Sequence, residues 1–210
     1  MTPSITVLCG DLDTELMVKA QHDDSESFRL LLERNRTVVV QYLARMVQNR
    51  GVAEELAQDV FIRVYRSRLS YEPSAKFSTW LYRITTNVAL NYFRDEKHTK
   101  FSVSLDTPEI THSSRFTQDA RPLVEDELVK DAVAQQIRRA IRALPPKQRA
   151  AVIMHKYQDM DYAQIGKVIG CTPSAVKALM FRAYETLRSR LRHLDHAPLE
   201  NGDVAEPQAA

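Results

Sequence analysis

The chain has 210 residues, of which 44% are hydrophobic and 27% charged, and its formal net charge is +2. These values are typical of a soluble protein of one or two domains. The two cysteines, Cys9 and Cys171, form no CxxC pair, and the six histidines form no HExxH set. Disulfide frameworks and metal sites are therefore not expected. There is no apolar run of membrane-spanning length and no basic signal-peptide segment, so we expect a cytoplasmic protein without metal or cofactor.

The charge is unevenly distributed along the chain. Residues 132–194 contain twelve Lys or Arg and three acidic residues, which gives a net charge of +9. Residues 104–131 contain seven acidic residues and three basic ones, which gives −4. The near-neutral total therefore hides a basic C-terminal block that follows an acidic segment.

Helical periodicity dominates the first 94 residues. We expect a helix over 11–21 with Leu12, Leu16 and Ala20 on one face. A second helix over 25–48 should end at Asn49-Arg50-Gly51. Its inward side chains are Phe28, Leu31, Leu32, Val39, Leu43 and Met46.

A third helix, from Ala53, has two stripes. Ala53, Leu56, Ala57, Val60 and Val64 form a buried stripe. The opposite stripe is mostly acidic and contains Glu55, Gln58, Asp59 and Ile62. This second stripe is either a docking surface for a partner helix or an ordinary solvated face.

A fourth helix is expected from Ser78, which can serve as its N-cap. A turn-rich segment, 70–76, precedes it and ends at Lys76. Leu81, Ile84 and Val88 share one side of this helix, whereas Arg83 and Asn87 share another, with Asn91 at its edge. Asn and Arg read bases and bind phosphates, but a plain surface face has the same composition.

From about 95 to 131 the periodicity fades, which predicts a flexible linker between two domains. The second block begins with a helix marked by Val133, Ile137, Ile141 and Leu144. A helix carrying Ala150, Val152, Ile153 and Tyr157 follows the Pro145-Pro146 break.

The strongest local pattern is a predicted helix-turn-helix. Asp161 and Gln164 have the spacing of a capping box, Gly170 allows a left-handed turn, and Thr172-Pro173 starts the next helix. In this motif the N-terminal part of the second helix enters the major groove. Its outward side chains are Ser174, Lys177, Ala178, Phe181 and Arg182. Two packed helices with basic solvated faces are the alternative.

The strings AEELAQDVFIRVYRS and FSTWLYRI resemble region 2 of the bacterial sigma-70 family, in its extracytoplasmic-function branch. The string ALPPKQRAAVIMHKYQDMDYAQIGKVIGCTPSAVKALMFRAYETLRSRL resembles region 4. The resemblance implies an all-α fold with two small helical domains joined by a flexible linker. The implied division is a flexible N-terminus (1–10), region 2 (11–95), an acidic linker (96–131), region 4 (132–194) and a disordered tail (195–210).

The resemblance also implies functions, none of them enzymatic. Core RNA polymerase would be bound by Glu55, Gln58, Asp59 and Ile62, on the clamp coiled coil of its large subunit. The −10 promoter element would be contacted by Lys76, Arg83, Asn87 and Asn91, with a flipped base held by the 70–76 segment. The −35 element would face Ser174, Lys177, Ala178, Phe181 and Arg182. The resemblance also implies an anti-sigma protein as a further partner.

Two departures and two other classes of function limit this interpretation. Arg83 and Ile84 stand where housekeeping sigma factors have a tryptophan pair, which predicts less robust promoter melting. Ala175, Ala178, Gln164 and Tyr184 depart from frequent residues of the branch and leave the −35 preference open.

A stand-alone helix-turn-helix regulator is the alternative function. A nucleic-acid-processing enzyme has little support, because no catalytic cluster or phosphate loop is present.

Overall fold

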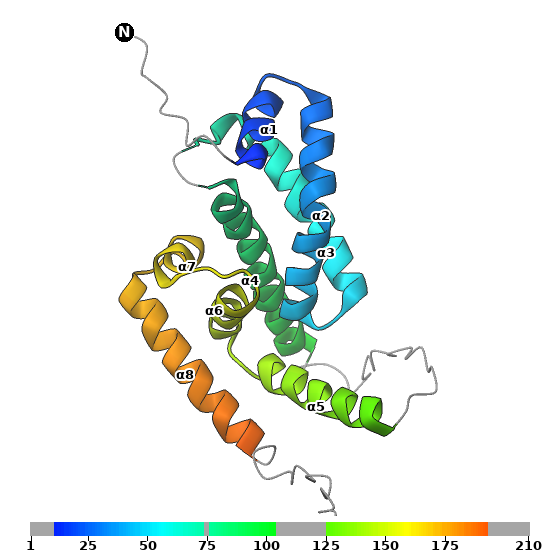
Figure 1. The fold of residues 1–210 in the computed structure, drawn as a ribbon, viewed down its shortest axis with the longest axis vertical. Coiled ribbons are helices and arrows are strands. Elements are labelled where there is room, and N and C mark those ends of the chain that lie inside the picture. The colour runs from blue at the N-terminus through cyan, green and yellow to red at the C-terminus, as the bar shows by residue number, and fades with distance from the viewer. Residues whose placement is uncertain (1–10, 74–75, 104–124, 193–210) are drawn as a thin grey trace, which may run out of the picture.

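A computed structural model gives the structure of the chain. It describes residues 11–73, 76–103 and 125–192, and the backbone alone for 97–103 and 125–131. All regular structure in these residues is helical, which confirms the predicted all-α fold (Figure 1). The elements are α1 (Leu12–Gln21), α2 (Ser25–Val47), α3 (Arg50–Arg66), η1 (Arg68–Ser70), α4 (Phe77–Val103), α5 (Glu125–Arg142), α6 (Pro146–Tyr157), α7 (Tyr162–Ile169) and α8 (Pro173–Leu191). The predicted N-terminal segment (1–10) and tail (195–210) lie outside the described residues.

The first four helices pack around one core. α2 packs against α1 and α3, and α4 closes the group by packing on α3 and α2. Met17, Leu43 and Val60 are completely buried between these helices. The apolar stripe predicted for α3 is the side that enters the core, because Ala53, Ala57, Val60 and Val64 are buried while Leu56 is half-buried.

Two predicted helix ends differ from the structure. α2 ends at Val47, and the left-handed residue that follows is Gln48, with φ 57°, rather than Gly51. Asn49 instead starts α3, because its side-chain oxygen accepts a hydrogen bond from the N–H of Val52 at 3.2 Å. α4 begins at Phe77, so Ser78 lies inside the first turn and is not the N-cap.

The helices on either side of the predicted linker are longer than expected. α4 continues to Val103, and α5 already begins at Glu125. Helix propagation adds one hydrogen bond per residue once a helix exists, and no Pro or Gly interrupts 95–103 or 125–131. The fading of apolar periodicity therefore did not mark the ends of these helices. The remaining linker residues, 104–124, lie outside the described residues.

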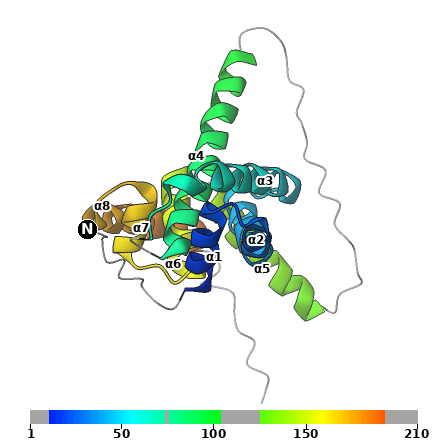
Figure 2. The same cartoon turned by 90° about the horizontal axis from the view of Figure 1, so that it is seen from above.

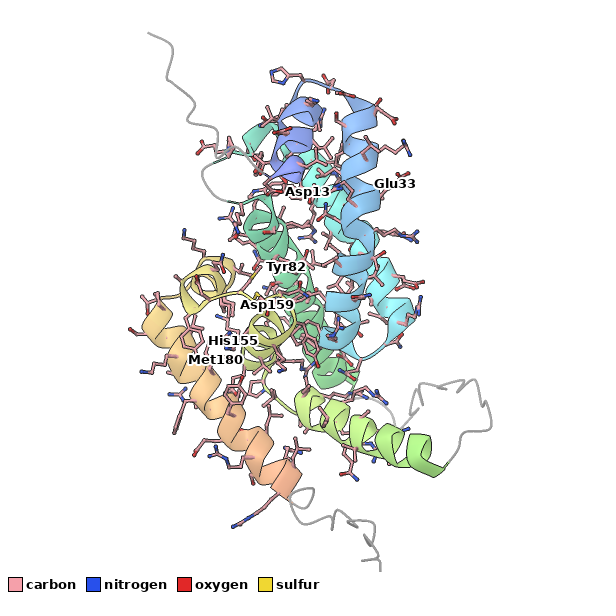
Figure 3. All side chains as sticks on the ribbon, in the orientation of Figure 1. Asp13, Glu33, Tyr82, His155, Asp159 and Met180 are labelled. Carbon is pink, nitrogen blue, oxygen red and sulfur yellow. The ribbon has the colours of Figure 1, made fainter. Side chains whose placement is uncertain are left out.

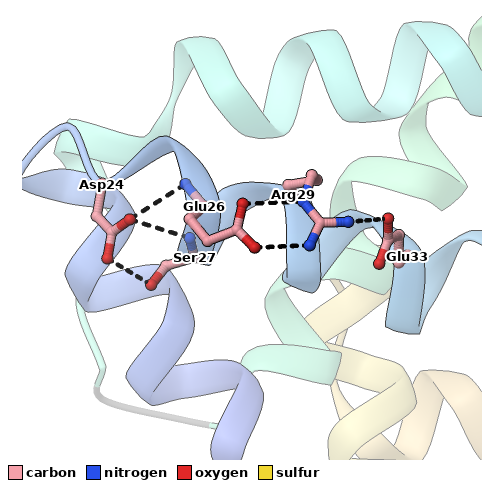
Figure 4. Close-up of polar contacts among 5 residues, drawn as sticks. All are labelled: Asp24, Glu26, Ser27, Arg29 and Glu33. Carbon is pink, nitrogen blue, oxygen red and sulfur yellow. Dashed lines mark hydrogen bonds and ion pairs between the residues drawn. The ribbon is translucent and has the colours of Figure 1, made fainter.

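The N-terminus of α2 carries a local polar network (Figure 4). Asp24 accepts hydrogen bonds from the N–H groups of Glu26 and Ser27 and from the Ser27 hydroxyl. The bonds from Ser27 lower the pKa of the Asp24 carboxyl. Arg29 forms ion pairs with Glu26 and Glu33 on the exposed side of the helix. Such exposed pairs contribute little stability, so the cap is the part of this network that fixes where α2 begins.

The last four helices form a second group that packs directly on the first. α8 contacts α5, α6 and α7, whereas α7 and α6 pack against α4, and α6 also contacts α2. Figure 1 shows α4 in the centre, between α1–α3 on one side and α6–α8 on the other. Seen from above, the C-terminal turns of α4 project away from the rest of the molecule (Figure 2). We call the contact of α6 and α7 with α2 and α4 the junction.

A buried arginine joins the two groups at the junction. Arg149 of α6 is only 6% exposed, and its guanidinium donates hydrogen bonds to the carbonyl oxygens of Met46, Arg142 and Leu144. Met46 lies in the last turn of α2, and Arg142 is the last residue of α5. Carbonyls at helix C-termini have no intrahelical donor and attract positive charge. Arg149 therefore caps two helices from different halves, while burial lowers its pKa.

Aromatic side chains complete the junction. The buried Tyr82 of α4 donates a hydrogen bond to the side-chain oxygen of Gln158, which follows α6 (Figure 3). A tyrosine hydroxyl is protonated and can donate at neutral pH, and burial raises the pKa of Tyr82 further. Arg45 of α2 lies 4.4 Å from the ring centroid of Tyr157. Tyr157 is 46% exposed and lies at the rim of the junction under this guanidinium.

We predict that Arg149→Met lowers the free energy of unfolding by about 2–4 kcal/mol, because three carbonyl oxygens lose a charged donor. Denaturant unfolding followed by circular dichroism measures this change. Arg139→Met, on the exposed side of α5, is the control and should change stability by less than about 0.5 kcal/mol. Equal unfolding midpoints for wild type and Arg149→Met would contradict the assigned role.

Candidate functional site

The outer side of α3 presents an acidic and apolar surface. Glu55, Gln58, Asp59 and Ile62 are all exposed, opposite the buried stripe of the same helix. We call these four residues the α3 face. Ile62 is 48% exposed. A single exposed aliphatic side chain is ordinary on a protein surface, so Ile62 matters here only because it also lines an apolar groove.

An apolar groove runs beside the α3 face. It has a volume of about 460 Å³ and lies between α2 and α3. Its apolar walls include Phe28 and Leu32 from α2 and Phe61 and Tyr65 from α3, while Gln58 and Ile62 belong both to the groove and to the α3 face. The periodicity of the sequence predicts the acidic stripe but not this groove, since the groove depends on how α2 and α3 pack.

α4 places three polar side chains along one side. Arg83 and Asn87 are exposed and lie one turn apart, and Asn91 is half-buried one turn further on. Lys76 is exposed immediately before the helix. We call Arg83, Asn87 and Asn91 the α4 face. Ile84, in contrast, packs against the core, so Arg83 is the solvent-facing member of the Arg83–Ile84 pair.

The neighbouring side chains of α4 are used for packing. Trp80 is half-buried and packs against the core, where its ring lies 5.0 and 5.8 Å from those of Tyr71 and Phe77. Thr85 and Thr86 are completely buried. The Thr86 hydroxyl shares a hydrogen bond of 2.9 Å with the Tyr42 hydroxyl of α2. Over residues 77–91, the α4 face is therefore a narrow exposed strip on a helix that is otherwise buried or half-buried.

α7 and α8 form the predicted helix-turn-helix. The Asp161–Gln164 capping box is present, with Gln164 N–H donating to Asp161 at 2.7 Å and Asp161 N–H donating to Gln164 at 3.0 Å. Gly170 has the left-handed φ of 75°. The Thr172 hydroxyl caps α8 by accepting from the N–H of Ala175 at 3.2 Å. The local signals in the sequence thus predicted this turn correctly.

Gly166 is the point where the turn comes closest to α7. A Cβ atom at this position would lie 2.6 Å from the carbonyl oxygen of Cys171. The N–H groups of Gly170 and Cys171 both donate to the Gly166 carbonyl at 2.9 Å. The absence of a side chain therefore lets the turn fold back onto α7.

The N-terminal half of α8 presents a basic and aromatic face. Its exposed side chains are Ser174, Lys177, Ala178, Phe181 and Arg182. We call this set the α8 face. Phe181 is 64% exposed. The opposite side is buried through Val176, Met180 and Ala183. Met180 is 1% exposed on the side of α8 that packs against α6 and α7, whereas Leu179 beside it is half-buried (Figure 3).

Sequence analysis also missed two residues of α1 that contact the segment before α4. Gln21 donates to the carbonyl oxygens of Arg68 and Tyr71, and Asp11 accepts from the N–H of Phe77. Asp11 had a detectable signal, because an Asp directly before a helix is a typical N-cap. Gln21 had none, since its partners are 47 and 50 residues away in sequence.

In the described part of the chain, no group of three or more His, Cys, Asp or Glu side chains is placed to hold a metal ion. Among the helices described here, none is long and apolar enough to cross a membrane.

The fold and its faces define a class: a two-part helical protein with a helix-turn-helix and a separate Asn–Arg face. The family model for Sigma-70 region 2 matches residues 31–99, and the model for Sigma-70, region 4 matches residues 134–187. The chain belongs to the extracytoplasmic-function (ECF) branch of the sigma-70 family of RNA polymerase sigma factors.

Several curated relatives support this membership. The ECF RNA polymerase sigma factor SigW of Bacillus subtilis (strain 168) is 30% identical over 187 residues, covering 86% of this chain and 100% of the relative. The RNA polymerase sigma factor CarQ of Myxococcus xanthus is 32% identical over 170 residues, covering 81% and 92%. The ECF RNA polymerase sigma-E factor of Escherichia coli (strain K12) is 27% identical over 185 residues, covering 87% and 95%.

Solved structures share the fold. CnrH, solved in complex with the cytosolic domain of CnrY, superimposes with a TM-score of 0.63 at 17% identity, covering 87% of this chain and 99% of that chain. The sigma factor RpoE of Bartonella quintana, solved with the anti-sigma factor NepR, gives a TM-score of 0.62 at 20% identity, covering 80% and 98%.

We predict that Gly166→Ala destabilises the helix-turn-helix by about 1–3 kcal/mol, because the added methyl group forces the turn away from α7. Thermal unfolding and binding to promoter DNA measure the effect. Gly170→Asn is a matched control: Asn tolerates the left-handed conformation better than other side chains, and open space surrounds Gly170. Unchanged stability of Gly166→Ala would show that the Cys171 carbonyl is free to move.

Proposed function

We propose that this sigma factor binds core RNA polymerase through the α3 face, on the clamp coiled coil of the large subunit. In the same proposal the α4 face and the 70–76 segment contact the −10 element, and the α8 face contacts the −35 element. Under these assignments, residues 11–95 bind core polymerase and the −10 element, and residues 132–194 bind the −35 element. The protein supplies promoter specificity in the cytoplasm and has no catalytic site of its own.

The observation that carries this proposal is the simultaneous exposure of three chemically distinct faces. The α3 face combines two carboxylates with an exposed isoleucine beside an apolar groove, which suits a helical protein partner better than DNA. The α4 and α8 faces instead expose Arg, Lys and Asn side chains, which are donors to phosphates and base edges. A stand-alone regulator needs only the α8 face and leaves the other two faces without a partner.

The junction supports control by an anti-sigma protein. The −10 and −35 elements lie about 25 base pairs apart, or about 85 Å along B-DNA. α8 spans only about 28 Å, and its partner α7 packs directly on α4. The chain therefore cannot contact the −10 and −35 elements at the same time until the junction opens. CnrH and RpoE were solved with the cytosolic domain of CnrY and with the anti-sigma factor NepR, and we propose that a similar partner stabilises the packed arrangement here.

Transcription from a promoter library, with core RNA polymerase in the presence and absence of the chain, tests the proposal. We expect transcription from a narrow set of promoters that share two spaced motifs. If core polymerase is unaffected and the chain alone binds duplex DNA tightly, the stand-alone regulator is correct instead.

We predict that the double variant Glu55→Lys and Asp59→Lys loses at least about 100-fold in affinity for core polymerase, because two favourable charge contacts become repulsive. Pull-down and fluorescence titration measure this loss. The control is Glu15→Lys with Glu33→Lys, which changes the net charge equally at exposed positions of α1 and α2. Wild-type affinity of the α3-face variant would remove this face from the polymerase interface.

We predict that Lys177→Ala or Arg182→Ala weakens promoter binding by about 1–3 kcal/mol and relaxes specificity at one or two −35 positions. Footprinting of the holoenzyme on promoters with single-base changes measures both effects. Arg190→Ala, an exposed residue in the last turn of α8, serves as the control and should weaken binding slightly and equally for all sequences. An unchanged upstream footprint for both α8-face variants would contradict the assignment.

A further inference from the structure

The segment between α3 and α4 is held at both ends by α1. Near the C-terminal end of α1, the side-chain amide of Gln21 donates to the carbonyl oxygens of Arg68 and Tyr71 at 2.9 and 2.8 Å. At the other end of α1, the carboxylate of Asp11 accepts from the N–H of Phe77 at 3.3 Å. Phe77 is the first residue of α4. α1 therefore contacts the segment where it begins and where it ends.

The chemistry of Gln21 suits this task. A primary amide has two N–H groups and can serve two carbonyl oxygens at once. Both of its acceptors belong to the backbone, so the contact fixes the path of the chain and not only a side chain. A glutamate of the same shape has no donor at neutral pH and cannot make either bond.

Asp11 joins the N-termini of two helices. Its carboxylate caps α1 by accepting from the N–H of Asp13 at 3.3 Å and from the Thr14 hydroxyl at 3.1 Å. The same carboxylate accepts from Phe77 of α4. The first N–H groups of a helix lack intrahelical acceptors, and a negative charge is favourable beside them. One side chain thus fixes the starts of α1 and α4 relative to each other.

Further contacts hold the beginning of the segment. Tyr71 is 3% exposed, and its hydroxyl donates to the Thr14 hydroxyl of α1 at 3.4 Å. Arg68 forms an ion pair of 2.7 Å with Asp23, which follows α1. Lys76, at the far end, remains exposed. The ends of the segment are therefore anchored while a group able to contact DNA stays accessible.

We infer that α1 is a positioning element for −10 recognition, in which Gln21 and Asp11 preset the ends of the segment that holds the flipped base. This inference rests on the proposed function of the 70–76 segment. Extruding a base from the duplex costs stacking and pairing free energy. When both ends of a segment are already held in place, less conformational entropy is lost as the segment closes on DNA. Loss of the α1 contacts should therefore impair promoter opening more than initial promoter binding.

The test compares holoenzymes that carry wild type or Gln21→Glu on two templates. One template is a duplex promoter, and the other has a premelted bubble over the −10 element. Permanganate reactivity measures opening of the duplex. We expect Gln21→Glu to reduce open-complex formation on the duplex about tenfold, the effect of losing two hydrogen bonds. Selectivity among single-base changes in the −10 element of the bubble template should also decrease.

Controls separate positioning from folding. Gln41→Glu makes the same chemical change at an exposed position of α2 and should behave as wild type. Gln21→Met tests whether the loss of the donors, rather than the added charge, causes the defect. Asp11→Asn keeps a side-chain acceptor and should retain most of the activity that Asp11→Ala loses. For all Gln21 variants, affinity for core polymerase and the −35 footprint should remain unchanged.

Two outcomes would overturn the inference. The first is wild-type opening and base selectivity for both Gln21 variants. The second is an equal loss of polymerase affinity, −35 footprint and promoter opening, which would indicate a purely structural role. If wild type itself opens no promoter with core polymerase, the proposed function fails first, so the two failures are distinguishable.

Discussion

α4 has to serve three surfaces at once, and the rest of the structure depends on this constraint. The Thr86 hydroxyl faces the first group, where it bonds to Tyr42 of α2. Tyr82 faces the junction and bonds to Gln158 after α6. The remaining strip, which carries Arg83 and Asn87, is exposed. A helix has room for such a division because side chains three or four residues apart share one side. The face proposed for −10 recognition is consequently placed by the same helix that holds the two halves together.

The junction contains polar contacts that water can replace when the two groups of helices separate. Several of its contacts are polar: Arg149 bonds to the Met46 carbonyl, Tyr82 to Gln158, and Arg45 lies over Tyr157. Polar groups of this kind can exchange protein partners for water when the surfaces separate, whereas an apolar interface loses its hydrophobic stabilisation without such compensation. Arg149 also bonds to Arg142 and Leu144 of its own half. Opening the junction therefore leaves its guanidinium partly satisfied.

The contacts that hold the ends of the segment before α4 come from the first group of helices. α1 packs on α2 and also contacts η1 and α4, so the path of the segment is fixed by the core of the first group. A partner bound at the α3 face acts on the same core, because α3 packs against both α2 and α4. In the proposed function, binding at α3 and base capture near α4 would therefore share one helical core.

The sequence by itself determined the helical class, the helix-turn-helix and the polar faces. These features arise from local interactions: the Asp161–Gln164 capping box, the left-handed Gly170 and the Thr172 cap all act within three or four residues. The exposed stripe of α3 follows from periodicity in the same way.

Only the tertiary structure decided which residues join distant elements. Gln21 bonds to Arg68 and Tyr71, Arg149 bonds to Met46, and Met180 rather than Leu179 fills the core beneath α8. None of these partners is set by spacing along the chain. They depend on which helix faces which, and helix packing is fixed by the combined shapes of many side chains.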